Sequence, residues 1–82
     1  MENNNEIINS LLMQILVLDS AEMLTEKTDF VDDCMADSLI LISIIVEVES
    51  ALDIEIPDED LVFENIRSYA WLCAEVMRLK NE

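Results

Sequence analysis

Apolar residues recur three and four positions apart in the first part of the chain, a spacing that predicts an amphipathic helix. The positions on its apolar face are Ile8, Leu11, Leu12, Ile15 and Leu16. Asparagine is a good N-cap, so the helix is expected to begin within residues 3–5, with Glu6 near the positive end of its dipole. The spacing fades near residues 19–20, where the helix is expected to end.

A second and more strongly apolar segment predicts a helix that begins at residue 37 or 38 and ends near Leu52. Asp37 is a typical N-cap residue. Helical spacing assigns Ile42, Ile45 and Val48 to the core face. That assignment leaves three other apolar residues of the segment at least partly exposed, namely Ile40, Leu41 and Val46.

A long connection, residues 20–36, lies between these helices and lacks sustained periodicity. It is expected to contain a short turn around residues 21–24 and to be anchored in the core by Phe30 and Val31. Connections of this length are unusual in compact domains and are often functional.

The rest of the chain predicts an extended piece and two helices. Ile54 and Ile56 alternate inward, and Pro57 suits the start of a short third helix over residues 58–63. The last helix is expected from residue 65 or 66 to Leu79. Its apolar stripe is Ile66, Tyr69, Ala70, Cys73, Val76 and Met77. Arg78 and Lys80 would complement the negative end of its dipole.

Composition agrees with a single all-α domain over residues 1–82, in which three longer helices and one short helix form a four-helix bundle. The 82 residues include no glycine and only one proline, which disfavours sheets with tight hairpins. The apolar run over residues 39–46 is too short to cross a bilayer. The first residues show no signal-peptide pattern, so a cytoplasmic protein is expected. We also expect a monomer.

The formal charge of −15 would repel nucleic acid and anionic membranes, which indicates partners with basic patches or a surface kept acidic for solubility. The absence of histidine excludes Ser-His-Asp and Cys-His catalysis, and Cys34 and Cys73 are not spaced as zinc ligands. We therefore expect no catalytic residue, no metal site and no enzyme activity. The acids around Asp32 lack the glycine and the spacing of a calcium loop, and a weak cation buffer is the remaining metal alternative.

Ser38 lies at the boundary between this acidic stretch and the apolar helix. A serine in the first turn of a helix is commonly only a cap. The helix start also favours a negative group, because its backbone N–H groups and dipole attract anions. A phosphate esterified to Ser38 would be stabilised there.

The segment "DFVDDCMADSLILISIIVEVESALDIEIPDED" resembles the central part of an acyl carrier protein. The resemblance rests on the Phe30 loop, on Asp37-Ser38-Leu39, and on "IEIPDED" at the following helix. It implies that Ser38 carries 4′-phosphopantetheine, attached from coenzyme A by a phosphopantetheinyl transferase. The arm would hold an acyl, aminoacyl or polyketide group as a thioester. Further implied partners are an acyl-loading enzyme, either a ligase or an acyltransferase, and downstream synthase or modifying enzymes.

Two departures from the family pattern stand out. Met35 replaces a usual glycine, and because methionine disfavours a positive φ, an ordinary or slightly altered backbone is expected there. The helix after Ser38 has apolar residues, with Ser43 in a common acidic position, which suggests apolar docking. The predicted partner contacts are Asp37, Leu39, Ile40, Leu41, Val46 and Glu47. We interpret the chain as a discrete carrier for a dedicated biosynthetic pathway. A housekeeping carrier of fatty-acid synthesis and an unmodified acidic interaction module remain alternatives.

Overall fold

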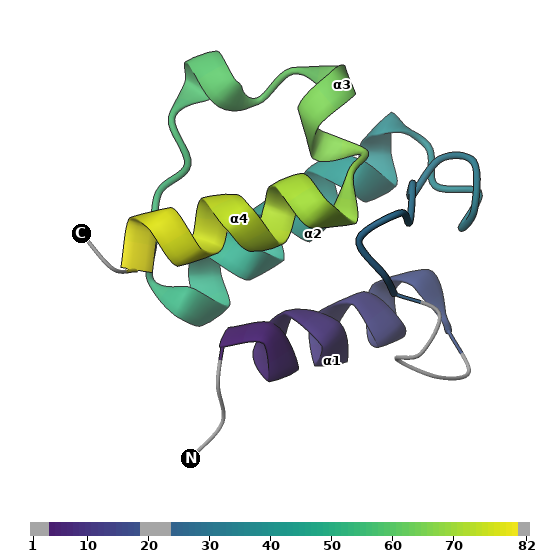
Figure 1. Ribbon diagram of the computed structural model, residues 1–82, viewed down its shortest axis with the longest axis horizontal. Helices are drawn as coiled ribbons and strands as arrows, with labels where there is room; N and C mark the ends of the chain where they lie inside the picture. Colours follow the sequence, from purple (N-terminus) through teal and green to yellow (C-terminus); the bar gives the residue numbers. More distant parts are fainter. Residues whose placement is uncertain (1–3, 19–23, 81–82) are drawn as a thin grey trace.

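A computed structural model describes residues 4–18 and 24–80, and within these ranges the chain is helical and contains no strand. The elements are α1 (Asn4–Leu16), α2 (Ser38–Leu52), the 3-10 turn η2 (Asp58–Asp60), α3 (Phe63–Ile66) and α4 (Tyr69–Lys80). Helices α1 and α3 each contact both α2 and α4 (Figure 1). The predicted all-α bundle of three longer helices and one short helix is confirmed.

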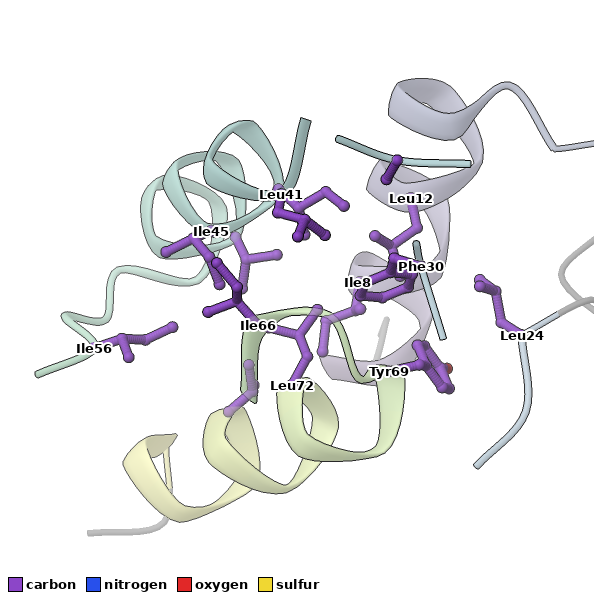
Figure 2. Packing of buried hydrophobic residues seen from close by; sticks show 14 of the residues in the cluster. Ile8, Leu12, Leu24, Phe30, Leu41, Ile45, Ile56, Ile66, Tyr69 and Leu72 are labelled. Atoms are coloured by element: carbon purple, nitrogen blue, oxygen red, sulfur yellow. The ribbon is translucent and has the colours of Figure 1, made fainter. Parts of the chain in front are cut away.

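The core lies between α1, α2 and α4 and is closed by the long connection (Figure 2). Phe30, from that connection, is fully buried, and its ring meets the ring of Tyr69 edge-on at 6.3 Å between centroids. Val31 is partly buried against the same cluster, so both predicted anchors are confirmed. The predicted turn at residues 21–24 lies largely outside the described residues.

Helix α1 begins at Asn4, as expected, but ends at Leu16, earlier than its pattern predicted. Val17 adopts a left-handed conformation (φ 54°), which stops the helix, and the Leu18 N–H donates to the Met13 carbonyl at 3.0 Å. The expected end at residues 19–20 lies outside the described residues.

Helix α2 has the predicted bounds, but its core face is rotated from the predicted one. Leu41 is fully buried, whereas Ile42 is 55% exposed. The prediction of exposure for Leu41 and of burial for Ile42 was therefore wrong. The buried positions are Leu41, Ile44, Ile45, Val48 and Leu52. These residues follow helical spacing as well as the predicted set does, and the nearly continuous apolar run leaves too few polar residues to distinguish the two.

The predicted third helix is a 3-10 turn, η2, separated from a single helical turn, α3. Pro57 precedes η2 as expected, and Ile56 is buried. The last helix begins at Tyr69 rather than at residue 65 or 66. The backbone of Arg67 and Tyr69 bonds to the long connection instead of continuing the preceding helix. The Ser68 hydroxyl then accepts a hydrogen bond from the Trp71 N–H at 3.2 Å and caps a new helix.

The apolar stripe of α4 is only partly the predicted one. Tyr69 and Val76 are buried, but Leu72, which the pattern missed, is also buried, and Met77 is 57% exposed. The predicted cations do lie in the last turn. Arg78 bridges Glu75 (3.0 Å) and Asp60 (3.7 Å), joining α4 to η2.

Lys80, the other cation of this turn, donates from Nζ to the Leu52 carbonyl at the end of α2, at 3.1 Å. No helix among residues 4–18 and 24–80 has both the length and the apolar character needed to cross a bilayer.

Candidate functional site

Ser38 is the first residue of α2, and its side chain is exposed. The preceding residue, Asp37, has an extended backbone, and its carboxylate accepts a hydrogen bond from the Ile40 N–H at 2.9 Å. The Asp37 carbonyl accepts from the Leu41 N–H at 3.0 Å. Asp37 is therefore the N-cap, as predicted, and the cap fixes the backbone at the exposed residue Ser38.

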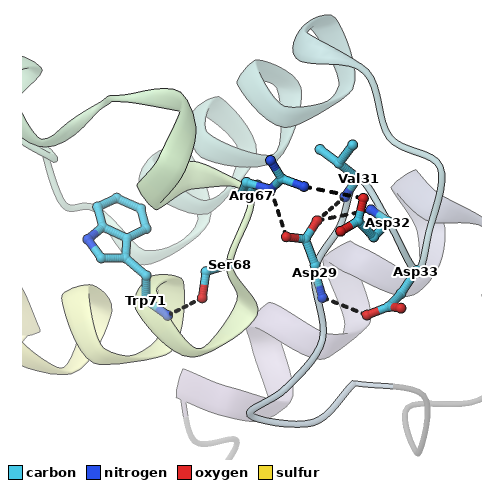
Figure 3. Close-up of polar contacts among 7 residues, drawn as sticks. All are labelled: Asp29, Val31, Asp32, Asp33, Arg67, Ser68 and Trp71. Carbon is cyan, nitrogen blue, oxygen red and sulfur yellow. Dashed lines mark hydrogen bonds and ion pairs between the residues drawn. The ribbon is translucent and has the colours of Figure 1, made fainter.

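The loop before Ser38 is stabilised by its own carboxylates (Figure 3). Asp29 Oδ1 accepts hydrogen bonds from the Val31 N–H (2.8 Å) and the Asp32 N–H (3.0 Å). Asp33 Oδ2 accepts from the Asp29 N–H at 2.8 Å. Because these acidic side chains hold backbone N–H groups, much of their capacity to accept is already used within the loop. No group of three or more potential metal ligands occurs in the described ranges.

Arg67 joins this acidic loop to the turn between α3 and α4. Its Nε lies 2.7 Å from Asp29 Oδ2, and its Nη2 lies 3.3 Å from Asp32 Oδ1. The guanidinium also lies over the Phe63 ring, 5.1 Å from the centroid, at cation–π distance. The hydrogen bond from Arg67 holds the pKa of Asp29 below its usual value. Sequence reasoning missed Arg67, and the available signal was only its scarcity, since the chain has four basic residues.

Met35, three residues before Ser38, has φ 59° and a side chain that is 87% exposed. The expectation of an ordinary or slightly altered backbone was therefore wrong, because the loop holds this methionine in a left-handed conformation. Cys34 beside it is partly buried against the core. Burial and the nearby charges of Asp33 and Asp29 raise the pKa of the Cys34 thiol, which makes it a poor nucleophile at neutral pH.

The surface of α2 next to Ser38 is apolar. Leu39 is 76% exposed and Val46 is 53% exposed, and Ile42 lies between them at helical spacing. Ile40 is half-buried and Glu47 is exposed. Leu41 points into the core, so this predicted partner contact is withdrawn, and Ile42 takes its place on the outer face. We call Leu39, Ile42 and Val46 the apolar face of α2.

A cavity of about 120 Å³ lies beside the apolar face, between α2 and the segment from η2 to α3. Its lining residues are Ile42, Ile45, Val46, Glu49, Leu61 and Ile66. Two members of the apolar face, Ile42 and Val46, therefore also form one wall of the cavity.

The geometry suits the attachment of a phosphodiester at Ser38. The hydroxyl is exposed, so a bulky group can be attached without displacing a core side chain. The adjoining helix start favours an anion. A family model described as the phosphopantetheine attachment site matches residues 6–76 of the chain. The chain belongs to the phosphopantetheine attachment-site family.

Curated relatives agree with this family assignment. An acyl carrier protein of Syntrophobacter fumaroxidans is 45% identical over 47 residues, which are 57% of this chain and 56% of that protein. Meromycolate extension acyl carrier proteins of Mycobacterium bovis and Mycobacterium tuberculosis are each 32% identical over 75 residues, covering 92% of this chain and 63% of each relative. The chain thus spans less than two thirds of the length of these relatives. The predicted family and its 4′-phosphopantetheine cofactor are confirmed.

Proposed function

We propose that the chain is a discrete carrier that holds acyl groups as thioesters on a 4′-phosphopantetheine arm attached to Ser38. The observation that carries the proposal is the exposed Ser38 hydroxyl at the first residue of α2, within a chain of the phosphopantetheine attachment-site family. The names of the relatives favour acyl cargo over aminoacyl or polyketide cargo. The chain supplies the hydroxyl and its placement, and a separate transferase supplies the base.

Intact mass spectrometry tests the attachment. The chain is incubated with coenzyme A, Mg²⁺ and a broad-specificity phosphopantetheinyl transferase, and a gain of one phosphopantetheine is expected. Ser38→Ala should abolish the gain, whereas Ser43→Ala, which removes another exposed α2 hydroxyl, should leave it unchanged. An unmodified wild-type chain would favour the acidic interaction module, and a gain that survives in Ser38→Ala would place the arm elsewhere.

We further propose that partner enzymes dock mainly on the apolar face of α2, with Asp37, Ile40 and Glu47 at its margin. Isolated exposed apolar residues are ordinary, but three at helical spacing beside the attachment point form a patch that excludes water when covered. The expected partners are the transferase, an acyl-loading ligase or acyltransferase, and downstream synthase or modifying enzymes. Apolar recognition of this kind suits a cytoplasmic, monomeric carrier dedicated to one pathway.

Partner capture in graded salt distinguishes this carrier from a housekeeping carrier of fatty-acid synthesis. Charge-led docking weakens as salt rises, whereas apolar docking persists. Leu39→Ser should reduce capture of the loading enzyme. Met77→Ser, a similar change at an exposed position of α4, should leave capture unchanged. A steep loss of wild-type binding with salt, with Leu39→Ser unaffected, would favour the housekeeping alternative.

A further inference from the structure

The loop that leads to Ser38 is tied to a distant part of the chain at residues 67–69. The Phe30 N–H donates to the Arg67 carbonyl at 2.7 Å, and the Tyr69 N–H donates to the Thr28 carbonyl at 3.3 Å. An isolated antiparallel bridge joins Asp29 to Ser68. The Arg67 side chain adds the contacts to Asp29 and Asp32 shown in Figure 3.

A short series of contacts connects this tie to the attachment point. Arg67 orients the Asp29 carboxylate, which holds the Val31 and Asp32 N–H groups and so shapes the turn. The turn is closed at Ala36, whose N–H donates a hydrogen bond to the Phe30 carbonyl at 2.9 Å. Asp37, which caps α2, follows Ala36 directly. The position of Ser38 thus depends on a turn whose outer side is held by Arg67.

The loop needs such a tie for two physical reasons. Asp29, Asp32 and Asp33 place three carboxylates within five residues, and their mutual repulsion opposes a tight turn. The left-handed backbone of Met35 adds strain, which persists only where surrounding contacts impose it. The Arg67 guanidinium contacts two carboxylates and lies over an aromatic ring. It can therefore offset the repulsion between the carboxylates and help to impose the left-handed backbone of Met35.

We propose that Arg67 is a positioning residue for the attachment serine. It holds the loop over residues 29–36 in the conformation from which Ser38 is presented to the transferase. The inference rests on the proposed function, because it takes Ser38 as the site of attachment. Ile66, which precedes Arg67 in the chain, lines the cavity. The turn that holds the loop therefore also carries part of the cavity wall.

Steady-state kinetics of the transferase on the apo-chain tests the proposal. Arg67→Met removes the charge and the hydrogen bonds but keeps an apolar stem. Asp29→Asn breaks the ion pair but keeps an Oδ1 that accepts from the Val31 and Asp32 N–H groups. The matched control is Arg78→Met, the same change at a cation that contacts Glu75 and Asp60, away from the loop.

Both loop variants should lower kcat by about threefold to tenfold, as expected for the loss of a partly exposed ionic network. KM should stay within about twofold, because the apolar face of α2 is unchanged. Arg78→Met should change neither constant by more than about twofold. Arg67→Lys, which keeps the charge without the planar fork, should recover part of kcat.

Circular dichroism at the assay temperature gives the folded fraction, to which each kcat is normalised. If Arg67→Met does not fold, Asp29→Asn and Arg67→Lys carry the same comparison. Normalised kcat values equal to wild type in the loop variants, or an equal fall in Arg78→Met, would overturn the positioning role alone. A wild-type chain that gains no phosphopantetheine would overturn the proposed function and this inference with it.

Discussion

Met35 offers a sharp test of how this fold accommodates a non-glycine residue in a left-handed conformation. Its backbone is left-handed (φ 59°), a conformation in which the Cβ of an L-residue crowds the carbonyl oxygen. Its side chain is 87% exposed, so truncation removes almost no buried apolar surface. Replacing Met35 with glycine therefore isolates the backbone contribution at this position.

The expected gain follows from two opposing quantities. Relief of the left-handed strain stabilises the folded chain by roughly 1–2 kcal/mol. The added freedom of glycine in the unfolded chain costs roughly 0.5–1 kcal/mol. Met35→Gly should thus raise the free energy of unfolding by up to about 1.5 kcal/mol, with a central value of about 0.75 kcal/mol, which is a rise of several degrees in Tm for a domain of this size. Met35→Ala keeps the Cβ and should leave stability nearly unchanged.

Urea and thermal unfolding followed by circular dichroism measure these differences under one set of conditions. Two other left-handed residues provide an internal series, because Val17 (φ 54°) is β-branched and Asp53 (φ 54°) tolerates this region well. The gain on substitution by glycine should be largest at Val17 and smallest at Asp53. The reasoning would be refuted if Met35→Gly were no more stable than Met35→Ala.

Three further predictions concern the core, the acidic loop and the thiols. Leu41→Ala should lower the free energy of unfolding by about 2–5 kcal/mol, whereas Ile42→Ala on the exposed side should lower it by less than about 1 kcal/mol. Urea unfolding measures both changes, and equal losses of stability would contradict the observed buried face of α2. Because the folded-state pKa of Asp29 is lowered, its ion pair should stabilise the fold at pH values above 3.8, the pKa of this carboxyl in the unfolded chain. This stabilisation should be lost as the pH falls through the folded-state pKa. The stability difference between wild type and Asp29→Asn should therefore shrink in acid, and a difference that grows would disprove the assignment. Burial raises the pKa of both Cys34 and Cys73, so alkylation at pH 7, followed by mass spectrometry, should be slower at either than at free cysteine.

The sequence predicted best those features that depend on neighbouring residues. The bounds of α2 follow from a capping aspartate and a long apolar run, and the cap at Asp37 forms as expected. The prediction of the buried face failed in the same helix, because residues 39–46 are apolar on nearly every side. Packing of α2 into the shared core, rather than the local pattern, buries Leu41 and leaves Ile42 exposed.

Contacts between distant residues were beyond the reach of local patterns. Nothing near Arg67 in the sequence indicates that it pairs with Asp29, 38 residues earlier. The start of α4 was misplaced for a related reason, since residues 67–69 bond to the loop backbone instead of continuing a helix from α3. The left-handed Met35 was also missed, because the residue type argued against a conformation that the surrounding turn imposes.

The four basic residues of this chain, whose formal charge is −15, are used mostly for contacts within the fold. Arg67, Arg78 and Lys80 each contact oxygen atoms from another segment of the fold, so three of the four cations serve as internal ties. The outer surface consequently keeps most of the acidic charge, while α2 beside Ser38 presents leucine, isoleucine and valine. A partner that approaches this region meets an apolar face surrounded by a negative field. Under the proposed docking, the negative field would speed the encounter with basic partners, and close contact with the apolar face would decide which of them binds.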